Sequence, residues 1–126
     1  LIHILISEVS MTNCNHEEEH AFAAARAKMN MPKEEEIVSL ATAFKAISEP
    51  SRLKILFALR QGEMCVYHIT EAVGSTQSAV SHQLRILRDN RIIKARRDGQ
   101  NVVYSLADAH VMAVLSLACE HLSCTF

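Results

Sequence analysis

The fold is decided by residues 76–85, which read Thr76-Gln77-Ser78-Ala79-Val80-Ser81-His82-Gln83-Leu84-Arg85. From this stretch onward, apolar side chains recur at helical spacing on one face, at Val80, Leu84 and Leu87. The side chains left for the opposite face are polar, namely Gln77, Ser78, Ser81, His82 and Arg85. We therefore expect a helix that is capped by Ser75 or Thr76, ends at about Asn90 and presents hydrogen-bonding groups on its outer face.

Helices and a hairpin are expected on both sides of this stretch. Upstream, apolar periodicity and its breaks predict helices from Glu34 to about Ile47, from the cap Ser51 to just before Gly62, and from about Val66 to Val73. Downstream, two β-prone runs flank Asp98-Gly99-Gln100, which is typical of a hairpin turn, and Asp108 caps a final helix that reaches about Leu122. Two short helices followed by a basic hairpin predict a mainly α winged helix-turn-helix with a β-hairpin wing.

The composition fits one folded domain that binds nucleic acid. The chain has 126 residues, 49% of them hydrophobic, and its three glycines and two prolines argue against an all-β fold. No apolar run is long enough to span a membrane. The net charge is −1, yet residues 76–100 hold six basic and two acidic groups, which suits the phosphates of double-stranded DNA. We expect bases to be contacted by Gln77, Ser78, Ser81 and His82, and phosphates by Arg85, Arg96 and Arg97.

The chain is expected to divide into an N-terminal extension, residues 1–32, and a winged helix-turn-helix domain, residues 33–126. Residues 1–10 are apolar but lack the basic flank and the length of a signal peptide, so we interpret them as an extension outside the core. Residues 17–29, Glu-rich and then Ala-rich, are expected to form a helix. Without an export signal, the expected location is the cytoplasm, where the four cysteines would be reduced.

The final helix carries metal-ligating side chains at both ends of an apolar seam. One face holds, at spacings of four and three residues, His110, Val114, Leu117, His121 and Cys124. Such a seam is typical of a helix that pairs with its own copy, so a homodimer through the terminal helices is expected. The neighbouring stripe is expected to face the chain's own core, and comprises Val111, Leu115, Ala118 and Leu122.

An antiparallel pair of these helices would complete a metal site. His110 and His121 are separated by ~16 Å along one helix at ~1.5 Å per residue, which a single ion cannot span. Pairing centred near residues 115–116 places His110 opposite the second copy's His121, and Asp108 near its Cys124. Two equivalent sites result, whose carboxylate, imidazole and thiolate ligands suit tetrahedral Zn²⁺. The alternative for Asp108 is a helix cap without any metal. The alternative for each histidine is a hydrogen-bonded residue of the dimer interface.

Over about residues 35–124, the sequence closely resembles the ArsR/SmtB family of metal-responsive repressors. The resemblance rests on residues 48–56, residues 77–84, the wing Arg97-Asp98-Gly99-Gln100 and the last helix. It implies a homodimer that represses a palindromic operator and dissociates from it when metal binds. The family's site on this helix reads Asp-x-His, ten residues, then His-x-x-Glu or His, from which Cys124 departs. Zn(II) is the expected effector, and Co(II), Ni(II) and Cd(II) are the alternatives.

A second metal site is indicated more weakly by residues 63–68. Glu63-Met64-Cys65-Val66-Tyr67-His68 resembles the family's thiolate box, Glu-Leu-Cys-Val-Cys-Asp. Tyr67 replaces the second cysteine, which argues against a thiolate-rich site for arsenic, lead or cadmium. The N-terminal arm would supply further ligands, as in some relatives: Cys14, His16 and His20. A buried Cys65 and a polar tail are the structural alternative.

Other classes of function fit the sequence less well. Neither a phosphate-binding glycine loop nor a motif for nucleophilic catalysis is present, so we expect no enzyme, no small organic substrate and no membrane partner. The alternative function is a thiol-based redox-sensing repressor of the same fold, using Cys65 with Cys14, or Cys119 with Cys124. For the metal sensor, we expect His121 to transmit the switch toward the DNA-binding helices through Gln77.

Overall fold

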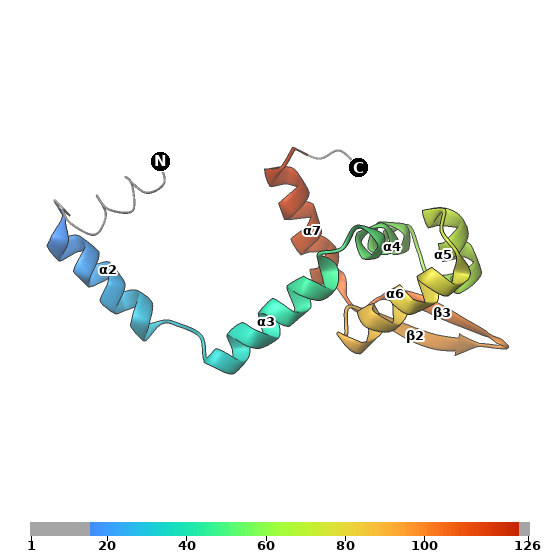
Figure 1. Ribbon diagram of the computed structural model, residues 1–126, viewed down its shortest axis with the longest axis horizontal. Coiled ribbons are helices and arrows are strands. Elements are labelled where there is room, and N and C mark those ends of the chain that lie inside the picture. The colour runs from blue at the N-terminus through green and yellow to red at the C-terminus, as the bar shows by residue number, and fades with distance from the viewer. Residues whose placement is uncertain (1–15, 124–126) are drawn as a thin grey trace. The chain divides into compact units, whose positions relative to one another are not determined.

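The computed structural model describes residues 16–123 and divides the chain into two compact units, with the boundary between Ile37 and Val38. The first unit contains α2 (Glu17–Met29) and the start of α3 (Glu34–Ile47). The later elements are α4 (Pro50–Arg60), β1 (Met64–Cys65), α5 (Val66–Val73), α6 (Gln77–Asp89), β2 (Ile93–Asp98), β3 (Asn101–Leu106) and α7 (Ala109–His121) (Figure 1). The boundary expected at residues 32 and 33 stays a prediction.

The helix of the first unit has no buried residue. Three glutamates in the first turn of α2, and Arg26 and Lys28 in its last turn, complement the helix dipole. The side-chain amide of Asn30 donates to the Arg26 carbonyl at 2.8 Å and closes the helix. The helix expected over residues 17–29 is therefore confirmed, and the charges at its two ends favour it.

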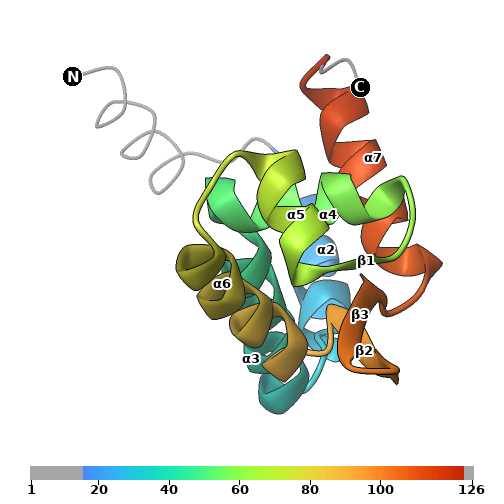
Figure 2. The ribbon, with the colours of Figure 1, turned by 90° about the vertical axis from the view of Figure 1, so that its right-hand side faces the viewer.

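The core of the second unit lies where α4, α5 and α6 meet the sheet (Figure 2). Its most buried side chains are Ile55, Leu56, Leu59, Ile69, Val80, Leu84, Leu87, Ile92 and Ile93. Gly74 ends α5 in the left-handed conformation, at φ 67°, which lets the chain turn directly into α6. This packing fixes α6 with one face inward and gives the predicted winged helix-turn-helix.

The sheet has three antiparallel strands in the order β1-β3-β2, one more than the sequence predicted. The hairpin of β2 and β3 turns at Gly99, whose φ is 62°, and pairs Arg96 with Val103. The additional strand, β1, is only two residues long and pairs Met64 with Tyr104. A strand of two residues is too short to show a periodicity in the sequence, so its pairing with β3 becomes visible only in the folded sheet.

The cap expected for α4 is corrected by the structure. Glu49, rather than Ser51, is the N-cap, because its carboxylate accepts the Arg52 backbone N–H at 3.1 Å. Pro50 takes the first helical position, where its missing N–H costs nothing, and Ser51 therefore lies inside the first turn. For α6, Thr76 is the cap, and its hydroxyl accepts from the Ala79 backbone N–H at 3.2 Å.

The buried face of α7 is also corrected. Leu115 is buried and Val111 half-buried, as expected, but Ala118 and Leu122 are exposed. The half-buried positions include Met112 and Cys119 instead. At 100° per residue, the inward face of α7 is thus turned farther from the seam of His110 and His121 than the sequence pattern suggested. The seam itself is consequently more exposed.

Candidate functional site

The residues expected to contact bases all lie on the exposed face of α6. Burial of Val80, Leu84 and Leu87 holds the opposite face against the core. The exposed side chains are Gln77, Ser78, Ser81, His82 and Arg85. Hydroxyl, amide, imidazole and guanidinium groups are the donors and acceptors that bind base edges and phosphates in a major groove. The structure therefore brings this predicted set together on one surface.

The wing places its two predicted phosphate-binding arginines on β2, and one of them has a carboxylate partner. Arg97 and Arg96 are both exposed. Arg96 forms a two-point ion pair with Glu63, with Nε donating to Oε2 at 3.3 Å and a terminal nitrogen donating to Oε1. The hydrogen bonds from Arg96 lower the pKa of Glu63, and the same bonds raise the pKa of Arg96. Arg96 is therefore a cation, and two of its N–H groups already donate to the carboxylate of Glu63.

A depression of about 340 Å³ lies between α6 and β3. Its lining includes Ser81 and Arg85 from the predicted set, together with Arg88 and Tyr104, which the prediction of DNA contacts had omitted. The spacing of Arg88, three residues after Arg85, could have indicated their common face. Tyr104 had no such signal, because only the folded sheet brings β3 beside α6. Its two guanidinium groups and two hydroxyl groups are donors that suit a phosphate, whereas the carboxylate of Asp89, which also lines the depression, opposes an anion there.

At the start of α7, Asp108 and His110 form a local pair. The Asp108 carboxylate accepts the His110 backbone N–H at 2.8 Å, as the N-cap, and lies 3.2 Å from the His110 Nδ1. The backbone hydrogen bond from His110, followed by the one from its side chain, lowers the pKa of Asp108. Both side chains are accessible, His110 at 90%. The carboxylate is therefore ionised and partly engaged in capping.

The other two predicted ligands are at the far end of α7 or beyond it. His121 is the last residue of α7 and is exposed, whereas Cys124 lies outside the described residues. In residues 16–123, no group of three or more potential ligands is placed so that it could hold a metal ion. One chain thus brings Asp108 to His110 but not to His121.

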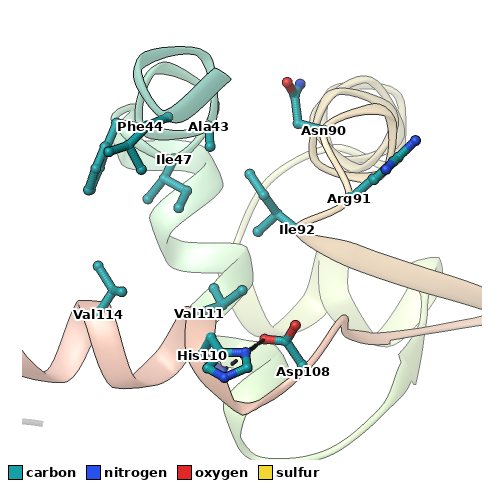
Figure 3. Close-up of a pocket in the computed structure, with 11 residues that line it drawn as sticks. Ala43, Phe44, Ile47, Asn90, Arg91, Ile92, Asp108, His110, Val111 and Val114 are labelled. Atoms are coloured by element: carbon teal, nitrogen blue, oxygen red, sulfur yellow. Dashed lines mark hydrogen bonds and ion pairs between the residues drawn. The ribbon is translucent and has the colours of Figure 1, made fainter. Parts of the chain in front are cut away.

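Asp108 and His110 border an apolar groove of about 250 Å³ between α3 and α7 (Figure 3). From α3, Phe44 and Leu40 line the groove, and they are 49% and 56% exposed. From α7, the lining includes Val114, which is 43% exposed. Two potential metal ligands therefore lie beside accessible apolar side chains in the same groove.

The described residues of the second predicted metal site lie in two separate pairs. The Cys65 sulfur lies 3.4 Å from Nδ1 of His68, at the junction of β1 and α5. His16 and His20 lie at the start of α2, in the other unit, with ring centroids 6.1 Å apart. Cys14 lies outside the described residues.

The second unit thus has the architecture of winged helix-turn-helix regulators, with a polar second helix and a basic hairpin. Residues 49–95 match the family described as "Bacterial regulatory protein, arsR family". The chain is also 46% identical over 82 residues to the HTH-type transcriptional regulator NmtR of Mycobacterium tuberculosis, covering 65% of this chain and 68% of that protein. The chain therefore belongs to the arsR family.

Further relatives are also transcriptional regulators. The transcriptional repressor SmtB homolog of Synechocystis sp. is 49% identical over 83 residues, which are 66% of this chain and 63% of that protein. The cadmium resistance transcriptional regulatory protein CadC homolog of Staphylococcus aureus is 36% identical, over 81% of this chain and 84% of its own length. The family and these relatives are regulators rather than enzymes, so the prediction that the chain is not an enzyme is confirmed.

Solved structures confirm the fold. NolR from Sinorhizobium fredii superposes with a TM-score of 0.67 at 35% identity, over 72% of this chain and 91% of that one. A homodimeric winged helix-turn-helix DNA-binding domain from Mycobacterium bovis gives a TM-score of 0.64 at 30% identity, over 74% and 93%. Within residues 16–123, no helix combines the length and apolarity needed to cross a bilayer.

Proposed function

We propose that the chain is a metal-sensing transcriptional repressor, which binds a palindromic operator as a homodimer and dissociates on binding Zn(II) or a related transition metal. The observation that carries the proposal is the exposed polar face of α6, flanked by the basic wing and by the depression at Arg85 and Arg88. The relationship to repressors supports the direction of regulation. The proposed location is the cytoplasm, where the protein would meet its operator DNA.

In this function, α6 enters the major groove. Bases would be contacted by Gln77, Ser78, Ser81 and His82, and phosphates by Arg85, Arg96 and Arg97. Two such helices related by a twofold axis would reach half-sites about 34 Å apart, so the operator would be an imperfect palindrome.

The proposed metal site would combine ligands from two copies of the chain. Asp108 and His110 of one subunit, with His121 and Cys124 of the partner subunit, supply carboxylate, imidazole and thiolate donors that suit Zn(II). The described members of this set are exposed, so a second copy can reach them. A bound ion would supply a crosslink between the two α7 helices, and Co(II), Ni(II) and Cd(II) could compete for the same donors.

DNA-binding titrations test the proposal. A duplex selected from a random pool by the metal-free protein should be palindromic, and Zn(II) added under reducing conditions should lower its affinity. A Co(II)-substituted sample should show thiolate charge-transfer absorption if Cys124 is a ligand. Failure to select any sequence, or an affinity that no transition metal changes, would contradict the proposal.

A thiol-based redox-sensing repressor is the second candidate, favoured by the 3.4 Å contact of Cys65 with His68. In this case, peroxide rather than Zn(II) would change DNA affinity, and Cys65→Ser would abolish a response that uses Cys65 with Cys14 but not one that uses Cys119 with Cys124. Disulfide partners would come from Cys14 for Cys65, or from Cys124 for Cys119.

A further inference from the structure

Arg52, in the first turn of α4, connects the C-terminal end of α3 to α6. Its guanidinium donates through Nε to the Ala46 carbonyl and through a terminal nitrogen to the Lys45 carbonyl at 3.3 Å. Its other terminal nitrogen donates to Oε1 of Gln83, on α6, at 2.9 Å. One side chain therefore fixes the end of one helix and a side chain of another.

The chemistry of arginine suits this position. Carbonyl groups in the last turn of a helix receive no hydrogen bond from the helix's own N–H groups. The negative end of the helix dipole also favours a cation at this end of α3. The planar guanidinium directs its donors along fixed edges, so it can bind α3 and Gln83 at once. Both Arg52 and Gln83 are half-buried, which restricts competition from water.

The two ends of this connection belong to different parts of the proposed function. On α3, Phe44 immediately precedes Lys45 and lines the groove shared with Asp108 and His110. On α6, Gln83 immediately follows His82, a proposed base contact. Arg52 thus lies between the surface proposed for dimerisation and metal binding and the helix proposed to read DNA.

We propose that the Arg52–Gln83 hydrogen bond is the positioning contact that couples the geometry of the dimer to the orientation of α6. The inference rests on the proposed function, and it names the contact through which metal binding changes DNA affinity. A dimer geometry that shifts the end of α3 moves Arg52, and Gln83 then turns α6 relative to the operator. Coupling of this kind requires only that metal and DNA prefer different geometries.

The test compares DNA affinity with and without Zn(II) in the full chain carrying Gln83→Met. Methionine retains the length of the side chain but accepts no comparable hydrogen bond from Arg52. In the wild type, Zn(II) should lower the DNA affinity by a regulation factor, which is the ratio of the affinity without Zn(II) to the affinity with it. Allosteric effectors usually give a factor of about 5 to 150. In Gln83→Met this factor should fall toward one, while Zn(II) affinity and dimerisation stay near those of wild type.

Two further variants distinguish coupling from a merely structural role. Gln83→Glu retains an acceptor for Arg52, so its factor should match that of wild type although its carboxylate lowers absolute DNA affinity. Gln61→Met changes an exposed glutamine at the end of α4 and should also respond like wild type. If Gln83→Met weakens DNA binding equally with and without Zn(II), the inference is wrong. If the Gln83 variants unfold, the test uses Arg52→Lys, which keeps the positive charge but lacks the planar guanidinium. In this variant, Zn(II) must no longer change the DNA affinity.

The wild-type titration separates this inference from the proposed function. A wild-type protein whose DNA affinity ignores metal overturns the proposed function and the coupling together. A wild type that responds, alongside a Gln83→Met variant that responds equally, overturns the coupling contact alone.

Discussion

Replacing Glu63 by glutamine should strengthen DNA binding, because Glu63 occupies the donors of Arg96. Two carboxylate oxygens of Glu63 accept from Arg96, whereas glutamine has one oxygen and no charge. A phosphate would therefore compete for Arg96 more effectively in the variant. The side chains of Arg96 and Glu63 are 54% and 48% exposed, so water screens the pair and its loss should hardly affect folding.

The size of the effect follows from counting phosphates. Glu63 and phosphate compete for each Arg96 in the wild-type complex, and each protomer has one such pair, so a dimer gains up to two phosphate contacts when both Arg96 side chains are released. A plot of log affinity against log salt should then steepen by up to about 0.9 per contact, or about 1.8 per dimer. Fluorescence anisotropy with the selected duplex, over a series of NaCl concentrations, measures this slope.

Two controls isolate the role of Arg96. Glu71→Gln removes an exposed carboxylate of α5 and tests for a general effect of net charge. Glu63→Gln in an Arg96→Ala background should add nothing, since no guanidinium remains to be released. The reasoning is refuted if the salt slope of Glu63→Gln equals that of wild type. It is also refuted if Glu63→Gln steepens the salt slope by the same amount in the Arg96→Ala background.

Other substitutions test the interface, the switch and the core. Arg97→Ala should weaken binding to all DNA sequences alike and flatten the salt slope by about one unit per contact; a changed base preference in competition assays would contradict this role. His121→Asn should still dimerise and bind operator but lose its response to Zn(II), so release at wild-type zinc concentrations would contradict the α7 site. Cys124→Ser should weaken metal binding or shift metal preference, as titration with Zn(II) and Co(II) would show. Leu56→Ala, at a fully buried position, should lower the free energy of unfolding by about 2–5 kcal/mol in urea denaturation, and an unchanged midpoint would contradict its burial.

Local signals explain why most of the fold could be predicted. The end of α5 at Gly74, the cap of α6 at Thr76 and the turn at Gly99 each depend on a few neighbouring residues. Competition between neighbours was harder to resolve: Glu49 and Ser51 can both cap a helix, and Pro50 decides between them by taking the first helical position.

The candidate site was less predictable wherever it depends on distant contacts. Glu63, the partner of Arg96, lies 33 residues away in the sequence, and Gln83, the side-chain partner of Arg52, lies 31 residues away. Tyr104 joins Arg88 in one depression only because β3 pairs beside β2 and near α6. By contrast, the polar face of α6 was predictable, since helical periodicity alone assigns its outward positions.

The proposed pairing of α7 helices accounts for two features that are otherwise separate. Val114 and Leu117 are 43% and 67% exposed, although apolar surface is stabilised by about 25 cal/mol for each Å² removed from water. Asp108 and His110 are at one end of the same helix and His121 is at the other, too far away for one ion. An antiparallel pair of α7 helices would bury Val114 and Leu117, and it would also place the first turn of one helix beside the last turn of the other. Metal binding and dimerisation would then stabilise each other, because the ligand set exists only in the dimer.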